Sequence, residues 1–300
     1  MSHRRTITFL TWMVIALGVV ASGIGLFSGE GAEENEGSHP IFTTIRGEQI
    51  ELYGSGIYKN DSLSAAAQAI AQDGVTLVVG IPLLLVSLLL SLRGTIRGRL
   101  LLAGALGYFT YTYASYSFLA MYNDLFLVYV LLFSGSLFAF ILVFRSVERE
   151  GVLMKTKLPC KSIGFILLLI AFLIIMLWLG RIAGGWRNGT APALLEHYTT
   201  LVIQALDLAV LLPLMVLTGA LLVRRQSYGY LLAPVVLVKA ATLLTSISSM
   251  MIGMLRAGVH VSMVELILFP IFNLAVIWCL ILVLRNAQEP APPASPLPIE

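Results

Sequence analysis

The chain has few charged residues. Lys, Arg, Asp and Glu together make up 12% of its 300 residues, while hydrophobic residues make up 58%. A soluble domain carries about twice that share of charge, so we expect an integral membrane protein. The net charge of +3 comes from short basic runs between apolar segments rather than from one basic patch, which argues against a nucleic-acid partner.

Cysteine and catalytic motifs are also scarce. Cys160 and Cys279 are the only cysteines, too few for a disulfide framework and without the spacing of a zinc site. The sequence contains no Walker loop, no HExxH, no G-x-S-x-G and no pair of intramembrane histidines of the kind that holds a haem. We therefore expect neither a cofactor nor an enzyme.

Long apolar segments are abundant. A helix of about 20 apolar residues crosses roughly 30 Å of hydrocarbon. We therefore expect an all-α integral membrane protein with an eight-span helical bundle whose main partner is the lipid bilayer. The spans are expected at about 7–27, 74–93, 100–121, 125–144, 162–180, 200–223, 230–253 and 264–285.

These spans divide the chain into four parts. The parts are an N-terminal anchor at 1–27, an extracytoplasmic segment at 28–72, a bundle of seven further spans at 73–285, and a disordered Pro-rich cytoplasmic tail at 286–300. The first span also resembles a signal peptide with a cleavage site near Ala21. Its apolar run continues through Phe27, which favours a retained anchor.

The basic residues indicate the orientation of the bundle. In the eight-span topology, thirteen of the nineteen Lys and Arg residues lie on the side of both chain ends, five lie on the other side, and Lys239 lies within a span. Cytoplasmic loops carry an excess of Lys and Arg. We therefore expect both termini in the cytoplasm and the protein in the cell (inner) membrane.

The extracytoplasmic segment has the pattern of a small β-hairpin. β-branched and aromatic residues at 42–45 and 49–53 flank a Gly-containing turn at 46–48. A two-stranded ribbon is marginal alone, so we expect it to lie on the outer helix ends. Asp61-Ser62 is then a typical N-cap for a short Ala-rich helix that leads into the next span.

Three stretches carry a resemblance to a known group. They are Glu51-Leu-Tyr-Gly-Ser-Gly-Ile-Tyr58, Tyr111-Thr-Tyr-Ala-Ser-Tyr116 and His197-Tyr-Thr-Thr-Leu-Val-Ile-Gln-Ala-Leu-Asp207. With these stretches the chain resembles an uncharacterised family of prokaryotic multi-pass integral membrane proteins with no known activity. The resemblance implies the membrane fold over about residues 40–285, and it implies no catalytic or binding residue.

The sequence also contains a weak internal repeat. A shift of 131 residues aligns Pro82 with Pro213, Gly98 with Gly229 and Ser115 with Ser246. Leucine-rich helices also match by chance. A real repeat would make spans one to four and five to eight two parallel four-helix halves, and transporters built from repeats hold their site at the interface.

Three polar residues fall inside expected spans: Gln204 and Asp207 in one, and Lys239 in the next. A charge at the bilayer centre costs at least about 2.5–3.5 kcal/mol, so such residues face the bundle interior and usually have a partner. At 1.5 Å per residue, Asp207 and Lys239 lie within about 10 Å in depth, and we expect them to be in contact. The pair is either a proton- or substrate-responsive site or an ion pair that only orients two helices.

Other polar side chains are expected around the same cavity. Polar stripes in lipid must face protein or water. An alternative to lining a cavity is that the hydroxyl groups of Thr242 and Ser246 serve only hydrogen bonding and close packing between helices. The predicted cavity residues are Asp207, Lys239, Gln204, Ser246, Thr242, Tyr108, Tyr111 and Asn273.

Acidic residues and histidines gather near the expected outer ends of the spans. Glu196, His197, His260 and Glu265 are weak candidates for a divalent metal site, but no two of them have the spacing of a ligand pair such as H-x-x-x-H. We expect a solvated rim without a metal. Asp73 and Asp124 are expected at helix starts, where a carboxylate caps backbone amides.

Two classes of function fit these features best, and a third, a membrane enzyme for lipid-linked substrates, is disfavoured because the sequence shows no paired acid and base. The first is transport of a small polar solute or a proton through the polar intramembrane cavity. The second is a sensory or accessory membrane subunit whose extracytoplasmic hairpin binds a protein partner and whose polar cluster only packs helices. A cavity that reaches the polar cluster favours transport, and a closed bundle favours the accessory role.

Overall fold

The structure is a computed structural model in which residues 3–29, 39–192 and 195–288 are described. Most of the predicted C-terminal tail and the acidic stretch at 30–38 lie outside the described residues. The predictions of disorder for them are therefore not addressed by the structure.

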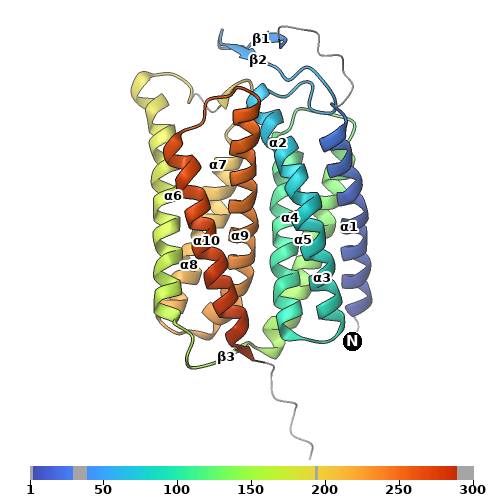
Figure 1. Ribbon diagram of the computed structural model, residues 1–300, viewed down its shortest axis with the longest axis vertical. Helices are drawn as coiled ribbons and strands as arrows, with labels where there is room; N and C mark the ends of the chain where they lie inside the picture. The colour runs from blue at the N-terminus through green and yellow to red at the C-terminus, as the bar shows by residue number, and fades with distance from the viewer. Residues whose placement is uncertain (1–2, 30–38, 193–194, 289–300) are drawn as a thin grey trace, which may run out of the picture.

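The described chain is mainly helical (Figure 1). Its helices are α1 (Arg4–Phe27), α2 (Leu63–Val75), α3 (Ile81–Leu92), α4 (Ile96–Leu119), α5 (Phe126–Glu150), α6 (Cys160–Asn188), α7 (Val202–Leu206), α8 (Leu212–Val223), α9 (Ser227–Arg256) and α10 (Met263–Asn286). The π-helical turns η1 (Thr76–Gly80) and η3 (Asp207–Leu211) join α2 to α3 and α7 to α8. The strands are β1 (Ile41–Thr43), β2 (Gln49–Glu51), β3 (Leu153–Met154) and β4 (Ala287–Gln288), paired β1 with β2 and β3 with β4, both antiparallel.

Seven of the described helices are long and apolar enough to cross a membrane. They are Arg4–Phe27, Leu63–Leu92, Phe126–Glu150, Cys160–Asn188, Val202–Val223, Ser227–Arg256 and Met263–Asn286. The chain is therefore a multi-pass membrane protein by the length and composition of its helices. The short helix predicted before the second span is not separate, because α2 continues through η1 into α3.

The bundle consists of two halves that lie side by side. Most of one hydrophobic core comes from α1–α5 and a second comes from α6–α10, while α4 and α9 pack against each other at the boundary. α2 also packs on α9, and α7 packs on α4. A Cβ atom at Gly104 of α4 would lie 2.4 Å from the Cβ of Val238 in α9, so the absence of a side chain there permits the close approach of the two halves.

The two π-helical turns have a common cause. A proline lacks the N–H of a helical hydrogen bond, and its ring clashes with the carbonyl four residues earlier. Pro82 and Pro213 each stand two residues after the end of a π turn, and the residues between, Ile81 and Leu212, donate their N–H groups to the carbonyls of Thr76 and Asp207. The wider turn accommodates the proline. The two turns are separated by 131 residues, the shift of the sequence repeat.

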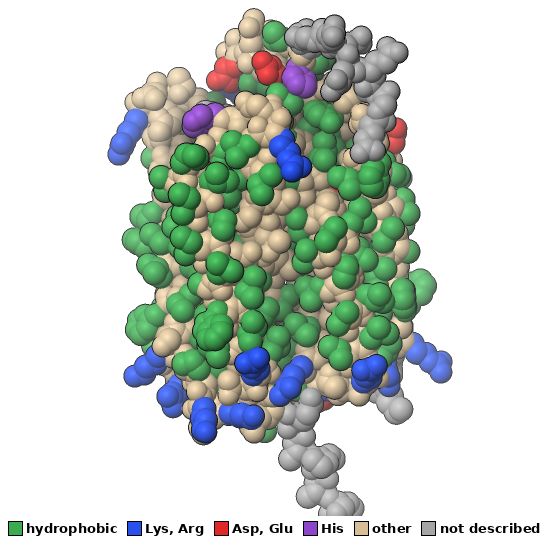
Figure 2. All heavy atoms as spheres, in the orientation of Figure 1, with side chains coloured by type: hydrophobic (Ala, Val, Ile, Leu, Met, Phe, Trp, Pro, Cys, Tyr) green, Lys and Arg blue, Asp and Glu red, His purple; other side chains and the backbone are tan. Residues whose placement is uncertain are grey.

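Charged side chains are segregated between the two ends of the bundle. Figure 2 shows most Lys and Arg side chains around the end where α1 begins and α10 ends, with Asp, Glu and His near the β1–β2 sheet at the other end. The wide band between them is largely hydrophobic.

The β1–β2 sheet lies over the end of the bundle, where the Arg46 guanidinium donates to the Glu196 carbonyl oxygen and the Phe42 ring lies edge-to-face with His197. Ile41 pairs with Glu51 and Thr43 with Gln49, and the Thr44 hydroxyl accepts hydrogen bonds from the backbone N–H groups of Arg46 and Glu48 in the turn. Ser62 is the N-cap of α2, where its hydroxyl accepts from Ala65 N–H at 3.1 Å.

We expect Gly104→Ala to destabilise the bundle, because the new methyl group would overlap Val238. The cost of such overpacking is about 1–3 kcal/mol. The matched control is Gly107→Ala in the same helix, where the nearest atom to a new Cβ is a Phe140 ring carbon at 3.9 Å. An alanine there should be neutral or stabilise the helix by up to about 1 kcal/mol. Apparent melting temperatures in detergent test this, and equal effects of the two substitutions would contradict the close approach of α4 and α9.

Candidate functional site

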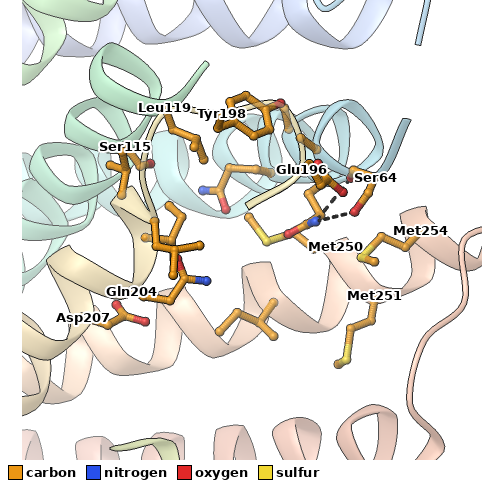
Figure 3. A pocket seen from close by; sticks show the side chains of 18 of the residues that line it. Ser64, Ser115, Leu119, Glu196, Tyr198, Gln204, Asp207, Met250, Met251 and Met254 are labelled. Atoms are coloured by element: carbon orange, nitrogen blue, oxygen red, sulfur yellow. Dashed lines mark hydrogen bonds between the residues drawn. The ribbon is translucent and has the colours of Figure 1, made fainter. Parts of the chain in front are cut away.

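A cavity of about 470 Å³ lies between the two halves of the bundle. Its wall includes residues of α2, α4, α6, α7, α9 and α10, together with loop residues at the end that carries the β1–β2 sheet. It extends from Asp61, Glu196 and Tyr198 at that end down to Gln204 and Asp207 (Figure 3). Asp207 lies five residues into the Val202–Val223 helix, or about 8 Å along its axis.

Asp207 forms the floor of this cavity and has both carboxylate oxygens engaged. The Tyr111 hydroxyl donates to Oδ1 at 2.5 Å, and the Trp178 indole N–H donates to Oδ2 at 2.9 Å. The donors come from α4 and α6, so the carboxylate connects the two halves. Only 6% of Asp207 is exposed. Hydrogen bonds of this kind are what allow a carboxylate to be buried.

Lys239 does not contact Asp207 directly, so the expected ion pair is wrong. Within the described residues no ion pair joins them, and the Lys239 ammonium has no hydrogen-bond partner. Its Nζ atom lies 3.8 Å from the centroid of the Tyr111 ring. Tyr111 therefore stands between the two charges, with its hydroxyl on Asp207 and its ring face toward Lys239, a favourable cation–π arrangement.

A second, much smaller cavity lies on the other side of the floor. Its volume is about 30 Å³, and it shares Trp178 and Asp207 with the large cavity while reaching Leu211, Leu212 and Met215. A volume of this size holds about one water molecule. The Asp207–Trp178 contact is therefore a thin partition between the large and the small cavity, and among the described residues no continuous packed core lies beneath it.

The walls of the large cavity differ in character. The α2, α4 and α7 side offers amides and hydroxyls, whereas the α9 side offers only apolar side chains. The polar residues are Ser64, Gln68, Gln72, Tyr111, Thr112, Ser115 and Gln204, and the α9 residues are Leu243, Ile247, Met250, Met251 and Met254. Such a cavity suits a ligand with one polar and one apolar face.

At the mouth, a loop between α6 and α7 is fastened to the start of α2. The Ser62 hydroxyl donates to the Glu196 carboxylate, the Tyr198 hydroxyl donates to Asp61 Oδ1 at 2.9 Å, and His197 Nε2 lies 3.1 Å from the Asn60 carbonyl oxygen. Asp61 also accepts from Met121 N–H at 3.0 Å, while its other oxygen has no partner among the described residues.

Burial shifts the titration of these mouth residues. Burial raises the pKa of Asp61 to about 6, against the two hydrogen bonds it accepts and with a further contribution from the charge of Glu196. Burial also raises the pKa of Glu196 and lowers the pKa of His197. Burial thus shifts the titration of all three residues toward their neutral forms, because it penalises a charge.

Asp73 is not the helix cap that we predicted from the sequence. It lies near the end of α2, only 1% exposed, and accepts hydrogen bonds from Tyr58 at 2.6 Å and Tyr116 at 3.3 Å. A Cβ at Gly25 of α1 would lie 1.9 Å from Asp73 Oδ2, so a glycine is required beside it. Asp124 is not a cap either, since α5 begins at Phe126 with Leu125 as N-cap.

The structure separates the predicted cavity residues into two groups. Asp207, Gln204 and Tyr111 line the cavity, whereas Lys239, Thr242, Ser246, Tyr108 and Asn273 do not. Thr242 and Ser246 donate to carbonyls of their own helix. Tyr108 accepts from Gln72 at 2.6 Å, and Asn273 donates to Thr245 at 2.9 Å.

Among the weak metal candidates, Glu196, His260 and Glu265 line the cavity and His197 does not. No group of three or more His, Cys, Asp or Glu residues with metal-binding geometry occurs in the described ranges. Glu265 is instead paired with Arg181.

Sequence reasoning missed Trp178 as the second donor to Asp207, and it missed the three methionines of the apolar wall. Only the spacing of Met250, Met251 and Met254 on one helix could have indicated them. A comparison of the chain with protein-family models, curated proteins and solved structures found no match. The resemblance drawn from the three sequence stretches stays a prediction.

We expect Asp61→Asn to remove a pH dependence of stability. The folded-state pKa of Asp61 lies above its ordinary value, so its protonation stabilises the fold at pH 4 and this contribution is lost as the pH rises through about 6. Asparagine keeps the oxygen that accepts from Met121 and Tyr198. The variant should match the wild type at pH 4 and exceed it at pH 7.5 by up to about 2–3 kcal/mol.

Melting temperatures at the two pH values measure this difference. Asp124 is exposed and lies outside the cavity, so it provides the control. The melting temperature of Asp124→Asn should match that of the wild type at both pH values. An Asp61→Asn effect that is equal at pH 4 and pH 7.5 would contradict the assignment.

Proposed function

We propose that the protein transports a small polar solute, or a proton, across the cell membrane. The observation that carries this proposal is the cavity that reaches a buried carboxylate inside a membrane-spanning helix. Buried ionisable groups in membrane segments are costly and commonly belong to substrate or proton pathways. A chain that needed only a packed bundle would have no use for a cavity of this size beside Asp207.

The proposal includes an eight-span topology with both termini in the cytoplasm. α4 would be the eighth span, because its 24 residues match α1 and α10 in length and it packs between α3, α5 and α9. Its Gly, Thr, Ser and Tyr content is explained by burial among these helices. The basic residues at the end where α1 begins and α10 ends support a cytoplasmic location for that end.

The proposal also takes the two halves as copies of one unit. Besides the matched π turns, Thr76 and Tyr108 stand at the positions equivalent to Asp207 and Lys239, and the Thr76 and Tyr108 hydroxyls lie 2.8 Å apart. The first half thus has a neutral hydroxyl contact where the second half has the two charges. A site at the interface of two repeats is typical of transporters.

In this mechanism Asp207 binds the solute or the proton, and Tyr111 controls its contact with Lys239. While Tyr111 occupies its observed position, the ring separates the amine from the carboxylate. Displacement of the ring would allow Lys239 to neutralise Asp207 and release what is bound there. The partition at Trp178 would open toward the small cavity in the same step.

The accessory role has one observation in its favour. Ile45 at the tip of the β1–β2 hairpin is fully exposed, and Ile41 is 64% exposed. The expectation that the hairpin packs onto the outer helix ends is therefore wrong for Ile45. An exposed apolar tip on the extracytoplasmic side suits a protein partner.

Cysteine accessibility on both sides of the membrane tests the proposal. In a background without Cys160 and Cys279, single cysteines replace Gln204 in the large cavity, Met215 in the small cavity, and Ser136, which is fully buried and lines neither. A membrane-impermeant methanethiosulfonate is added to sealed vesicles of either orientation. A transporter predicts that Gln204→Cys reacts from the hairpin side and Met215→Cys from the opposite side, with Ser136→Cys unreactive from both.

Reaction of Gln204→Cys from the hairpin side alone, with Met215→Cys unreactive from both sides, would contradict transport. It would indicate a closed ligand pocket and favour the accessory role.

A further inference from the structure

We propose that the ligand of the large cavity is an amphipathic organic cation, an ammonium group on an apolar body, with Asp207 as its counter-charge. This inference rests on the proposed function in one respect only, since it takes the same cavity as the solute site. Binding and its charge preference can be measured without any transport.

The first argument is the balance of charge in the cavity wall. Four acidic residues line the cavity, namely Asp61, Glu196, Asp207 and Glu265, against Arg181 and the histidine His260 among the described residues. The guanidinium of Arg181 is already paired with Glu265. Even if Lys239 behind Tyr111 is added, four acidic residues face Arg181, Lys239 and one histidine. The cavity therefore has an excess of acceptors for a cation.

The second argument is the unused acceptor capacity at the floor. An ionised carboxylate offers about four lone-pair positions, and Asp207 uses two of them for Tyr111 and Trp178. Figure 3 shows Gln204 next to Asp207 on the cavity side. The Gln204 side chain has no hydrogen bond within the described part of the chain, so both its carbonyl oxygen and its amide N–H groups are free, and the preference for a cation at the floor comes from the spare acceptor positions of Asp207. An ammonium donates to such acceptors and a carboxylate ligand cannot.

The third argument is an oxygen without a partner at the mouth. Asp61 is only 3% exposed, lines the cavity, and its Oδ2 atom has no hydrogen-bond donor among the described residues. Leaving a buried acceptor unpaired costs about 1–3 kcal/mol. A cationic ligand that enters through the mouth would supply the missing donor. Asp61 and Asp207 thus mark the outer and inner ends of one acidic path.

The fourth argument is the apolar wall. Met250, Met251 and Met254 of α9 line the cavity across from the polar side (Figure 3). Phe269 of α10 also lines it. Methionine side chains adapt to apolar ligands of different shape. A sugar or another ligand that is polar all round would leave its hydroxyls unpaired against this wall. A cavity of about 470 Å³ holds a ligand with a substantial apolar body.

An anionic ligand is disfavoured by the position of Lys239. Its ammonium is the one buried cation without an ion-pair partner in the described chain, but the Tyr111 ring covers it on the cavity side. An anion at the floor would meet Asp207 first and be repelled.

Three probes with one apolar body and different head groups test the inference. They are 4-phenylbutylammonium, 4-phenylbutan-1-ol and 4-phenylbutyrate, titrated calorimetrically into the purified full-length protein in detergent. We expect the ammonium to bind at least tenfold more tightly than the alcohol or the carboxylate. Asp207→Asn should weaken ammonium binding at least tenfold and change alcohol binding little, while the control Asp124→Asn should leave all three probes unchanged.

Several outcomes would overturn the inference: equal or tighter binding of 4-phenylbutyrate, undiminished ammonium binding by Asp207→Asn, or no binding of any probe. The wild-type comparison needs no variant, so poor folding of Asp207→Asn would not remove the test. Failure of the proposed function has a different signature. In that case the ammonium is still preferred, but the cysteine in the small cavity reacts from neither side.

Discussion

The structure depends on how a carboxylate is accommodated where water is scarce. Asp207 in the membrane-spanning part of the chain is buried with one donor on each oxygen, Tyr111 from the first half and Trp178 from the second. An unpaired charge at such a place costs several kcal/mol, so the two donors and the carboxylate hold three helices in one register. The cavity, the thin partition beneath it and the separation of Lys239 all follow from where this carboxylate lies.

The same constraint explains features elsewhere in the bundle. Asp73 is buried because Tyr58 and Tyr116 donate to it, and α1 carries a glycine at the one place where a side chain would collide with the carboxylate. Asp61 is only partly satisfied, since one of its oxygens has no donor among the described residues, and burial raises its pKa to about 6. The three carboxylates thus differ in how completely the protein supplies donors, and the least satisfied one lies at the mouth of the cavity.

The helices could be predicted from the sequence, but the contacts within the site only in part. Apolar length alone located the long helices, and the cost of burying charge identified Asp207 and Lys239. Their direct contact was wrong because depth fixes only one coordinate, whereas contact also depends on how each helix is rotated. The π turn at Asp207 adds one residue to a turn and changes that rotation. Asp73 was misplaced because the helix that begins at the predicted Ser62 cap continues through Asp73 into η1 and α3 without a new start.

The position of Tyr111 between Asp207 and Lys239 is tested most directly by the unfolding free energies of two single variants in detergent. The account predicts that Tyr111→Phe, which removes one donor to a buried carboxylate, costs about 1–3 kcal/mol. It predicts that Lys239→Met, which removes an amine without a hydrogen-bond partner, is neutral or stabilising. A direct ion pair requires the reverse, a loss of about 3–5 kcal/mol in Lys239→Met with little effect of Tyr111→Phe, and that result would contradict the account.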